Sequence, residues 1–168
     1  MIKKITLAVV VLLVAIQFVP MEKNDSGTNN FDISNNYQVP EHIATIMKGA
    51  CNDCHTNTTK YPWYSSIQPV GFWLNHHTNE GKEHLNFSEF TSLPLRVQNH
   101  KFEEIVEMVE SKEMPLPSYT YMGLHPEANL SDKDRKAVVD WAKEQMALLA
   151  ATYPADSLKM KPRPTPVQ

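Results

Sequence analysis

The chain begins with an apolar run, and the residues before and after this run indicate its role. The run covers residues 5–19, and Lys3 and Lys4 precede it. Basic residues before such a run stay in the cytoplasm, which indicates that the rest of the chain is exported. The run is short for a spanning helix of about 20 residues and long for a signal-peptide core of about 7–15. Since no small-x-small cleavage site follows, we interpret residues 1–21 as a membrane anchor or signal segment, and prefer an uncleaved anchor.

Two further segments have an unusual composition, and the expected domain lies between them. Residues 22–39 are rich in Asn, Asp, Ser and Gly and contain few side chains able to bury surface, which predicts a polar linker. Residues 153–168 form a proline-rich tail. The domain itself is therefore expected over residues 40–152.

Helical spacing of apolar residues recurs within that domain. Pro40 and Glu41 suit the first turn of a helix that runs into Cys51. Shorter patterns predict helices over residues 70–77 and about 102–112.

The last helix is the clearest element. Ser131 is a suitable N-cap, and Asp134 occupies the third position of a capping-box-like arrangement. Apolar residues then recur at helical spacing to about Ala150, and Pro154 ends the pattern. Because no strand-period alternation stands out, the pattern predicts an all-α fold.

Composition narrows the possible functions. A length of 168 residues suits one domain, and a net charge of -3 gives no reason to expect nucleic acid as a partner. The two cysteines, Cys51 and Cys54, lie close together in the chain. A disulfide closing so small a loop would stabilise little, because the entropic gain grows with loop length.

The pentapeptide CNDCH fits C-x-x-C-H, the signature of c-type haem attachment. Two thiols on one turn can form thioethers with the two vinyl groups of a single porphyrin, here from Cys51 and Cys54. The histidine directly after them, His55, is then held beneath the iron as the proximal ligand. The sequence therefore predicts one covalent haem c.

Two other kinds of site use the same residues. A thioredoxin-like dithiol normally opens a helix after a strand, whereas this motif follows a predicted helix. A zinc site would need further ligands, for which the sequence offers His76, His77 and His84. Both alternatives stay open at this point, with haem preferred.

The sixth iron ligand has two candidates. Met114 lies in a Met-Pro loop between two predicted helices, and the proline favours an extended geometry that projects the methionine side chain inward. His77 is the alternative, for an iron with two histidine ligands. A core-packing methionine and a solvated histidine remain the simpler interpretations of these residues.

Aromatic residues follow the motif. Tyr61, Trp63, Tyr64 and Trp73 are expected to pack against the haem edge or in the core.

The stretch CNDCHTNTTKYPWYSSIQPVGFWLNHHTNEGKEHLNFSEF, followed by EMPLPSYTYMGLHPEANLSDKDRKAVVDWAKE, resembles the small haem-binding-domain family of exported c-type cytochrome-like proteins. The resemblance covers roughly residues 40–147. It implies haem binding through Cys51, Cys54 and His55. It also implies a small cytochrome c-like helical domain around one haem, preceded by an N-terminal apolar helix. The aromatic and histidine-rich insertion at residues 60–90 departs from the common cytochrome c pattern.

These features predict a membrane-tethered electron carrier with a single haem on the periplasmic side of the bacterial cytoplasmic membrane. Such a protein needs redox partner proteins and an exposed haem edge rather than a substrate pocket. One alternative is a haem enzyme or gas sensor with an open distal site, where His76 or His77 could act with Arg96. The other is a metal-binding module without haem.

Overall fold

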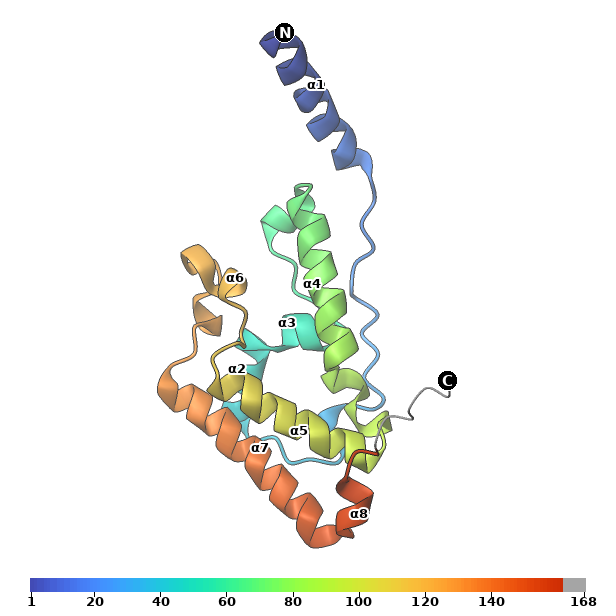
Figure 1. The fold of residues 1–168 in the computed structure, drawn as a ribbon, viewed down its shortest axis with the longest axis vertical. Helices are drawn as coiled ribbons and strands as arrows, with labels where there is room; N and C mark the ends of the chain where they lie inside the picture. The colour runs from blue at the N-terminus through green and yellow to red at the C-terminus, as the bar shows by residue number, and fades with distance from the viewer. Residues whose placement is uncertain (162–168) are drawn as a thin grey trace, which may run out of the picture.

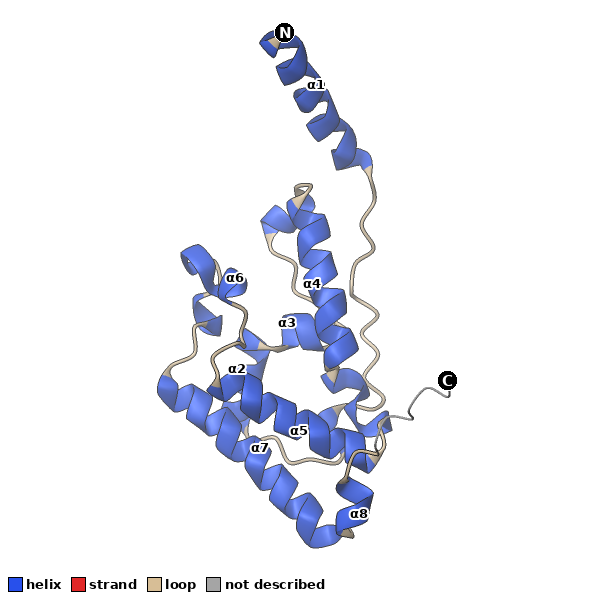
Figure 2. Cartoon of the chain, in the orientation of Figure 1, coloured by secondary structure: helices blue, strands red, loops and turns tan. Residues whose placement is uncertain are grey.

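The computed structural model describes residues 1–161, with the side chain of Met122 left aside. Within that part of the chain all regular structure is helical, as the sequence predicts (Figure 2). The α-helices are α1 (Ile2–Ala15), α2 (Glu41–Ala50), α3 (Asn52–His55), α4 (Val70–His84), α5 (Leu95–Glu110), α6 (Pro117–Thr120), α7 (Asp132–Thr152) and α8 (Ala155–Leu158). Six short 3-10 helices connect them: η1 (Ile16–Phe18), η2 (Ile33–Asn35), η3 (Trp63–Ser66), η4 (Phe87–Ser92), η5 (Tyr121–Gly123) and η6 (Pro126–Ala128).

Helix α1 projects away from the rest of the molecule (Figure 1). None of its residues is buried, although most of its side chains are apolar. No helix in the described part of the chain is both long enough and apolar enough to cross a membrane.

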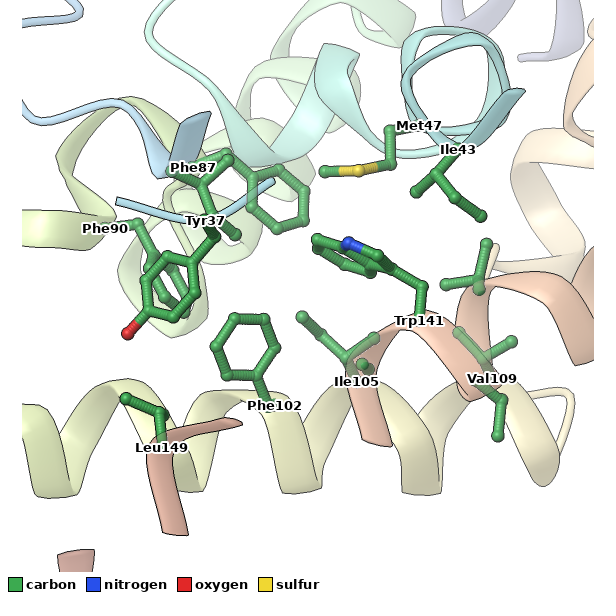
Figure 3. Packing of buried hydrophobic residues seen from close by; sticks show 14 residues of the cluster. Tyr37, Ile43, Met47, Phe87, Phe90, Phe102, Ile105, Val109, Trp141 and Leu149 are labelled. Atoms are coloured by element: carbon green, nitrogen blue, oxygen red, sulfur yellow. The ribbon is translucent and has the colours of Figure 1, made fainter. Parts of the chain in front are cut away.

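The hydrophobic core lies where α5 and α7 pack together (Figure 3). The Phe102 ring on α5 is fully buried, and its centroid lies 5.7 Å from that of Trp141 on α7 in an edge-on arrangement. The indole N–H of Trp141 donates a hydrogen bond to the Gln38 carbonyl at 3.0 Å. Aromatic pairs of this kind combine a large apolar area with a defined geometry, and this pair holds α7 against α5.

The segment expected as a polar linker, residues 22–39, lies against the domain. Ile33 and Tyr37 are buried in the core, and the Tyr37 ring packs edge-on against Phe102 at 5.0 Å. Asn24 is also buried, and its side-chain amide donates to the Thr56 carbonyl. These contacts could not be predicted from the polar composition, because hydrogen bonds rather than apolar packing hold the asparagine in place.

The predicted N-terminus of the last helix is confirmed, since the Ser131 hydroxyl accepts the Asp134 backbone N–H at 3.1 Å. Two other boundaries differ. Helix α5 begins at Leu95 instead of residue 102, and α4 continues to His84 instead of ending at residue 77. Of the predicted tail, Ala155–Leu158 is helical, while residues 162–168 lie outside the described part of the chain.

The short helix α3, which carries the CNDCH motif, lies between α2 and α4 and packs against both (Figure 1). Helix α4 rises on one side of α3, and the α6–η5 segment rises on the other. The partly buried motif is therefore flanked both by the helix that precedes it and by elements that are more distant in sequence.

Candidate functional site

The motif forms a single helical turn. Helix α2 ends at Ala50, and the carbonyl of its C-cap residue Cys51 accepts the backbone N–H groups of Cys54 at 3.2 Å and His55 at 3.0 Å. Both thiols and the imidazole are therefore presented by one turn, as C-x-x-C-H chemistry requires.

The imidazole of His55 is held by the C-terminal end of α4. Its Nδ1 lies 2.9 Å from the carbonyl oxygen of Leu85 and 2.9 Å from that of Gly81. Carbonyl oxygens only accept, so Nδ1 carries the proton and the lone pair is on Nε2. Burial lowers the pKa of His55, which favours the neutral ring. A neutral imidazole with an oriented Nε2 lone pair is the form that binds a metal.

Helix α4 approaches the motif unusually closely at Gly81. A Cβ at this position would lie 2.8 Å from the Cys54 carbonyl oxygen and 3.1 Å from the Cys54 Cβ. One turn earlier, Thr78 is also buried. The missing side chain at Gly81 thus allows α4 to reach His55 and Cys54 together.

The two thiols are poor nucleophiles in this setting. Desolvation, with a smaller contribution from Cys54, raises the pKa of Cys51 to about 12. Desolvation and the neighbouring Asp53 carboxylate raise the pKa of Cys54, against the opposing hydrogen bond from Thr78. Redox-active C-x-x-C pairs instead depend on a lowered thiol pKa. The electrostatics therefore disfavour the dithiol alternative.

A chain of polar side chains ties the motif to the α6–η6 region. The Tyr119 hydroxyl donates to the Asp53 carboxylate at 2.8 Å, and the Tyr119 ring stacks on His125 with centroids 4.0 Å apart. Nε2 of the buried His125 lies 2.7 Å from the Tyr64 hydroxyl. Asp53 inside the motif is thereby linked to η3 and to the loop before α7. The sequence gave no sign that Tyr119 contacts Asp53.

The two candidates for the sixth ligand lie on different elements. Met114 is half-buried in the loop after α5, where its carbonyl accepts a hydrogen bond from Arg135 at 2.6 Å. His77 lies on α4, with its ring 4.4 Å from the Trp73 ring. Its Nδ1 is buried and has no hydrogen-bond partner among the described residues. Neither observation tests iron ligation, so both assignments stay predictions.

Two of the aromatic residues expected at the haem edge or in the core lie outside the core. Trp63 is 77% exposed and Trp73 is 44% exposed. Tyr64 is half-buried and belongs to the polar chain described above.

Two surface hollows, of about 450 and 310 Å³, lie between α5 and α7. Both are bordered largely by charged residues, and neither includes Cys51, Cys54 or His55.

Comparison with known proteins decides the family. Residues 11–144 match the sequence profile of a family described as Haem-binding domain. The chain belongs to the haem-binding domain family. No curated protein and no solved structure matches it.

The residues of this haem-binding domain fit the group that the family name implies. Cys51 and Cys54 supply two thiols from one turn, and His55 supplies a neutral imidazole whose Nδ1 is already engaged. No cluster of three or more His, Cys, Asp or Glu residues suited to a bare metal ion occurs among residues 1–161. The α3 turn with its support from α4 is therefore the candidate haem site of this domain.

Proposed function

We propose that the haem-binding domain holds one haem c, with thioether bonds from Cys51 and Cys54 and with His55 as the proximal iron ligand. The observation that carries the proposal is the pair of 2.9 Å contacts from His55 Nδ1 to the carbonyls of Gly81 and Leu85. These two carbonyls accept from Nδ1, so Nε2 is the nitrogen of His55 that is available to bind iron.

The activity proposed for this site is one-electron transfer. The bound haem supplies the redox chemistry, and the chain supplies the ligands and their surroundings. The α4 carbonyls keep the His55 ring in one tautomer and orientation. The buried Phe87, whose ring centroid lies 6.1 Å from that of His55, excludes water from one side of the imidazole. Met114 is the proposed sixth ligand, with His77 as its alternative.

The proposed location is the periplasmic side of the cytoplasmic membrane, with residues 1–21 as the tether. Lys3 and Lys4 before the apolar run support this orientation. The apolar side chains of α1 support it too, because they are exposed around the whole helix. Val9, Val10 and Val11 are 49%, 50% and 59% exposed. A helix that is apolar on all sides requires an apolar environment.

Absorption spectra of the full chain, produced in a host with c-haem maturation, test the proposed activity. A low-spin spectrum in both oxidation states, with slow binding of carbon monoxide to the reduced protein, is the result expected of a carrier. A high-spin spectrum with prompt carbon monoxide binding would contradict it and favour the haem enzyme or gas sensor. A protein that binds no haem would contradict the proposal altogether.

A further inference from the structure

The turn between η3 and α4 lies at the end of the domain nearest to α1 (Figure 1). Two reciprocal hydrogen bonds join it to the apolar N-terminal segment. The Gln17 side-chain amide donates to the Gln68 carbonyl at 3.0 Å, and the Gln68 backbone N–H donates to the Gln17 side-chain oxygen at 3.0 Å. The end of the apolar segment is therefore fixed against this part of the domain. We refer to residues 61–75 as the η3–α4 tip.

The η3–α4 tip contains no charged residue and no histidine, although 21% of the chain is charged. The N-terminal segment that it contacts, residues 5–21, is equally free of charge. Two uncharged stretches that lie far apart in sequence thus meet at one end of the molecule. A surface that lies against lipid must avoid charged side chains, because burying an unpaired charge costs several kcal/mol or more.

The η3–α4 tip also exposes large apolar side chains. Trp63, Ile67, Val70 and Trp73 are 77%, 48%, 38% and 44% exposed. Phe18, just before the linker segment, is 83% exposed. Tryptophan is enriched where a membrane meets water, since its ring is apolar and its N–H can still reach a polar partner.

This exposure occurs on a well-packed turn. The buried Gln68 side-chain oxygen accepts the Phe72 backbone N–H at 3.0 Å. The buried Ser65 hydroxyl donates to the Pro62 carbonyl at 2.6 Å. A Cβ on Gly71 would lie 2.2 Å from the Ser65 carbonyl oxygen, so the two backbone segments are in close contact. The apolar side chains are therefore held outward by a defined backbone.

We propose that the η3–α4 tip docks into the interfacial layer of the bilayer, beside the segment that tethers the protein. This inference rests on the proposed membrane tether. Docking would also set the height of the haem site. Helix α4 has 15 residues, so its C-terminal end, which contacts His55, lies about 20 Å from its first residue in the tip. The tether and the tip together would hold the haem at a fixed distance and orientation above the membrane.

The test uses the haem-loaded full chain in phosphatidylcholine vesicles with either ordinary or brominated acyl chains. Bromine quenches only tryptophan that reaches the lipid, and the transfer of energy to haem is the same in both vesicles. The chain has three tryptophans, of which Trp141 is buried in the core. We expect brominated lipid to remove the emission of Trp63 and Trp73 and to spare that of Trp141.

The matched variant replaces Trp63 and Trp73 together by Phe, which keeps an apolar ring at each position. Its haem absorption spectrum reports whether it folds as the parent does, and its emission should be the same in both vesicles. If the parent floats with the vesicles but shows equal emission in both, the docking inference is overturned and the tether is retained. If the parent does not float with vesicles at all, the proposed tether fails, and the docking inference fails with it.

Discussion

The Nδ1 atom of His55 lies 2.9 Å from the carbonyl oxygen of Leu85, the residue that caps the C-terminus of α4. The last carbonyls of a helix have no partner within the helix, so they are available to a side chain. The neighbouring Gly81 carbonyl already accepts the Leu85 backbone N–H at 2.9 Å. The Leu85 carbonyl and the second lone pair of the Gly81 carbonyl can therefore both accept from His55, and the end of α4 serves as the support for the proposed iron ligand.

Replacing Gly81 by Ala should disturb this support. The new Cβ would lie 2.8 Å from the Cys54 carbonyl oxygen, which is backbone and cannot move aside alone. We expect a loss of about 1–3 kcal/mol in the free energy of unfolding. Alanine stabilises a helix by about 1 kcal/mol relative to glycine. A loss of stability in Gly81→Ala would therefore mean that the close contact costs more than this helix propensity contributes. Urea unfolding of the haem-loaded protein, followed by circular dichroism and haem absorption, measures both the stability and the ligation.

Gly49→Ala is the matched control for this change. Gly49 also lies in a helix, but its new Cβ would meet the side chain of the exposed Glu127 at 3.3 Å. The nearest atoms are the Cβ and Cγ of Glu127 at 3.3 and 3.4 Å, so a shift of a few tenths of an ångström relieves the contact, and we expect Gly49→Ala to lose less stability than Gly81→Ala. Equal losses in the two variants would show that the close contact at Gly81 has no special importance.

Tyr119→Phe should weaken the link between the motif and the α6–η6 region. It removes the hydroxyl that donates to the Asp53 carboxylate at 2.8 Å. Hydrogen bonds to charged groups contribute about 1.5–3 kcal/mol, so a loss near the lower end of this range is expected for a half-buried pair. Tyr121→Phe, at a residue that is 70% exposed, is the control and should leave stability unchanged. Urea unfolding of both variants and the parent makes the comparison, and a Tyr119→Phe protein as stable as the parent would refute the link.

Tyr37 should make stability depend on pH in the alkaline range. Desolvation, with a smaller effect of Tyr153, raises the pKa of Tyr37 from 10.0 to about 12. Because the folded protein then binds this proton more tightly than the unfolded chain, the stabilisation is complete below pH 10 and is lost as the pH rises towards 12.

Tyr37→Phe separates this effect from other alkaline titrations. The variant lacks the hydroxyl that donates to the buried Gln98 side chain, so below pH 10 we expect it to be about 1–2 kcal/mol less stable than the parent. The difference should narrow towards pH 12. Urea unfolding at several pH values measures it, and a constant difference would contradict the assignment to Tyr37.

A comparison of two variants can decide which residue is the sixth iron ligand. If Met114 binds the iron, Met114→Ala should abolish the weak charge-transfer band of methionine ligation and open the iron to carbon monoxide. His77→Ala should leave both properties unchanged. The opposite pattern, recorded by absorption spectroscopy of the oxidised and reduced proteins, would assign the ligand to His77.

Apolar spacing and capping residues allowed some of the helices to be predicted from the sequence. The N-terminus of α7 followed from Ser131 and Asp134, and the motif itself identified the α3 turn. The second half of α4 was missed because its packed positions are Thr78 and Gly81, which give no apolar periodicity. An isolated glycine in a polar helical stretch was the one available signal, since such a residue commonly marks a close contact.

Other parts of the site have no side-chain signature. The groups that hold His55 are backbone carbonyls, which every residue possesses, so no sequence pattern marks Leu85 as an acceptor. The contact between Tyr119 and Asp53 joins residues 66 positions apart and depends on the packing of the whole chain. The contacts of residues 22–39 with the domain escaped prediction because only a few of these residues, such as Ile33 and Tyr37, are buried, and their neighbours in the chain are polar.

Covalent attachment of haem is the central claim, and the mass of the denatured protein tests it most directly. The full chain and the variants Cys51→Ala and Cys54→Ala are produced with c-haem maturation, extracted with acid and acetone, and analysed by intact mass spectrometry. We expect the parent to retain the mass of one haem after extraction, and each variant to lose or greatly reduce that retained haem. A parent protein that releases its haem into the solvent, or carries none, would contradict the assignment of Cys51 and Cys54 as haem thioethers.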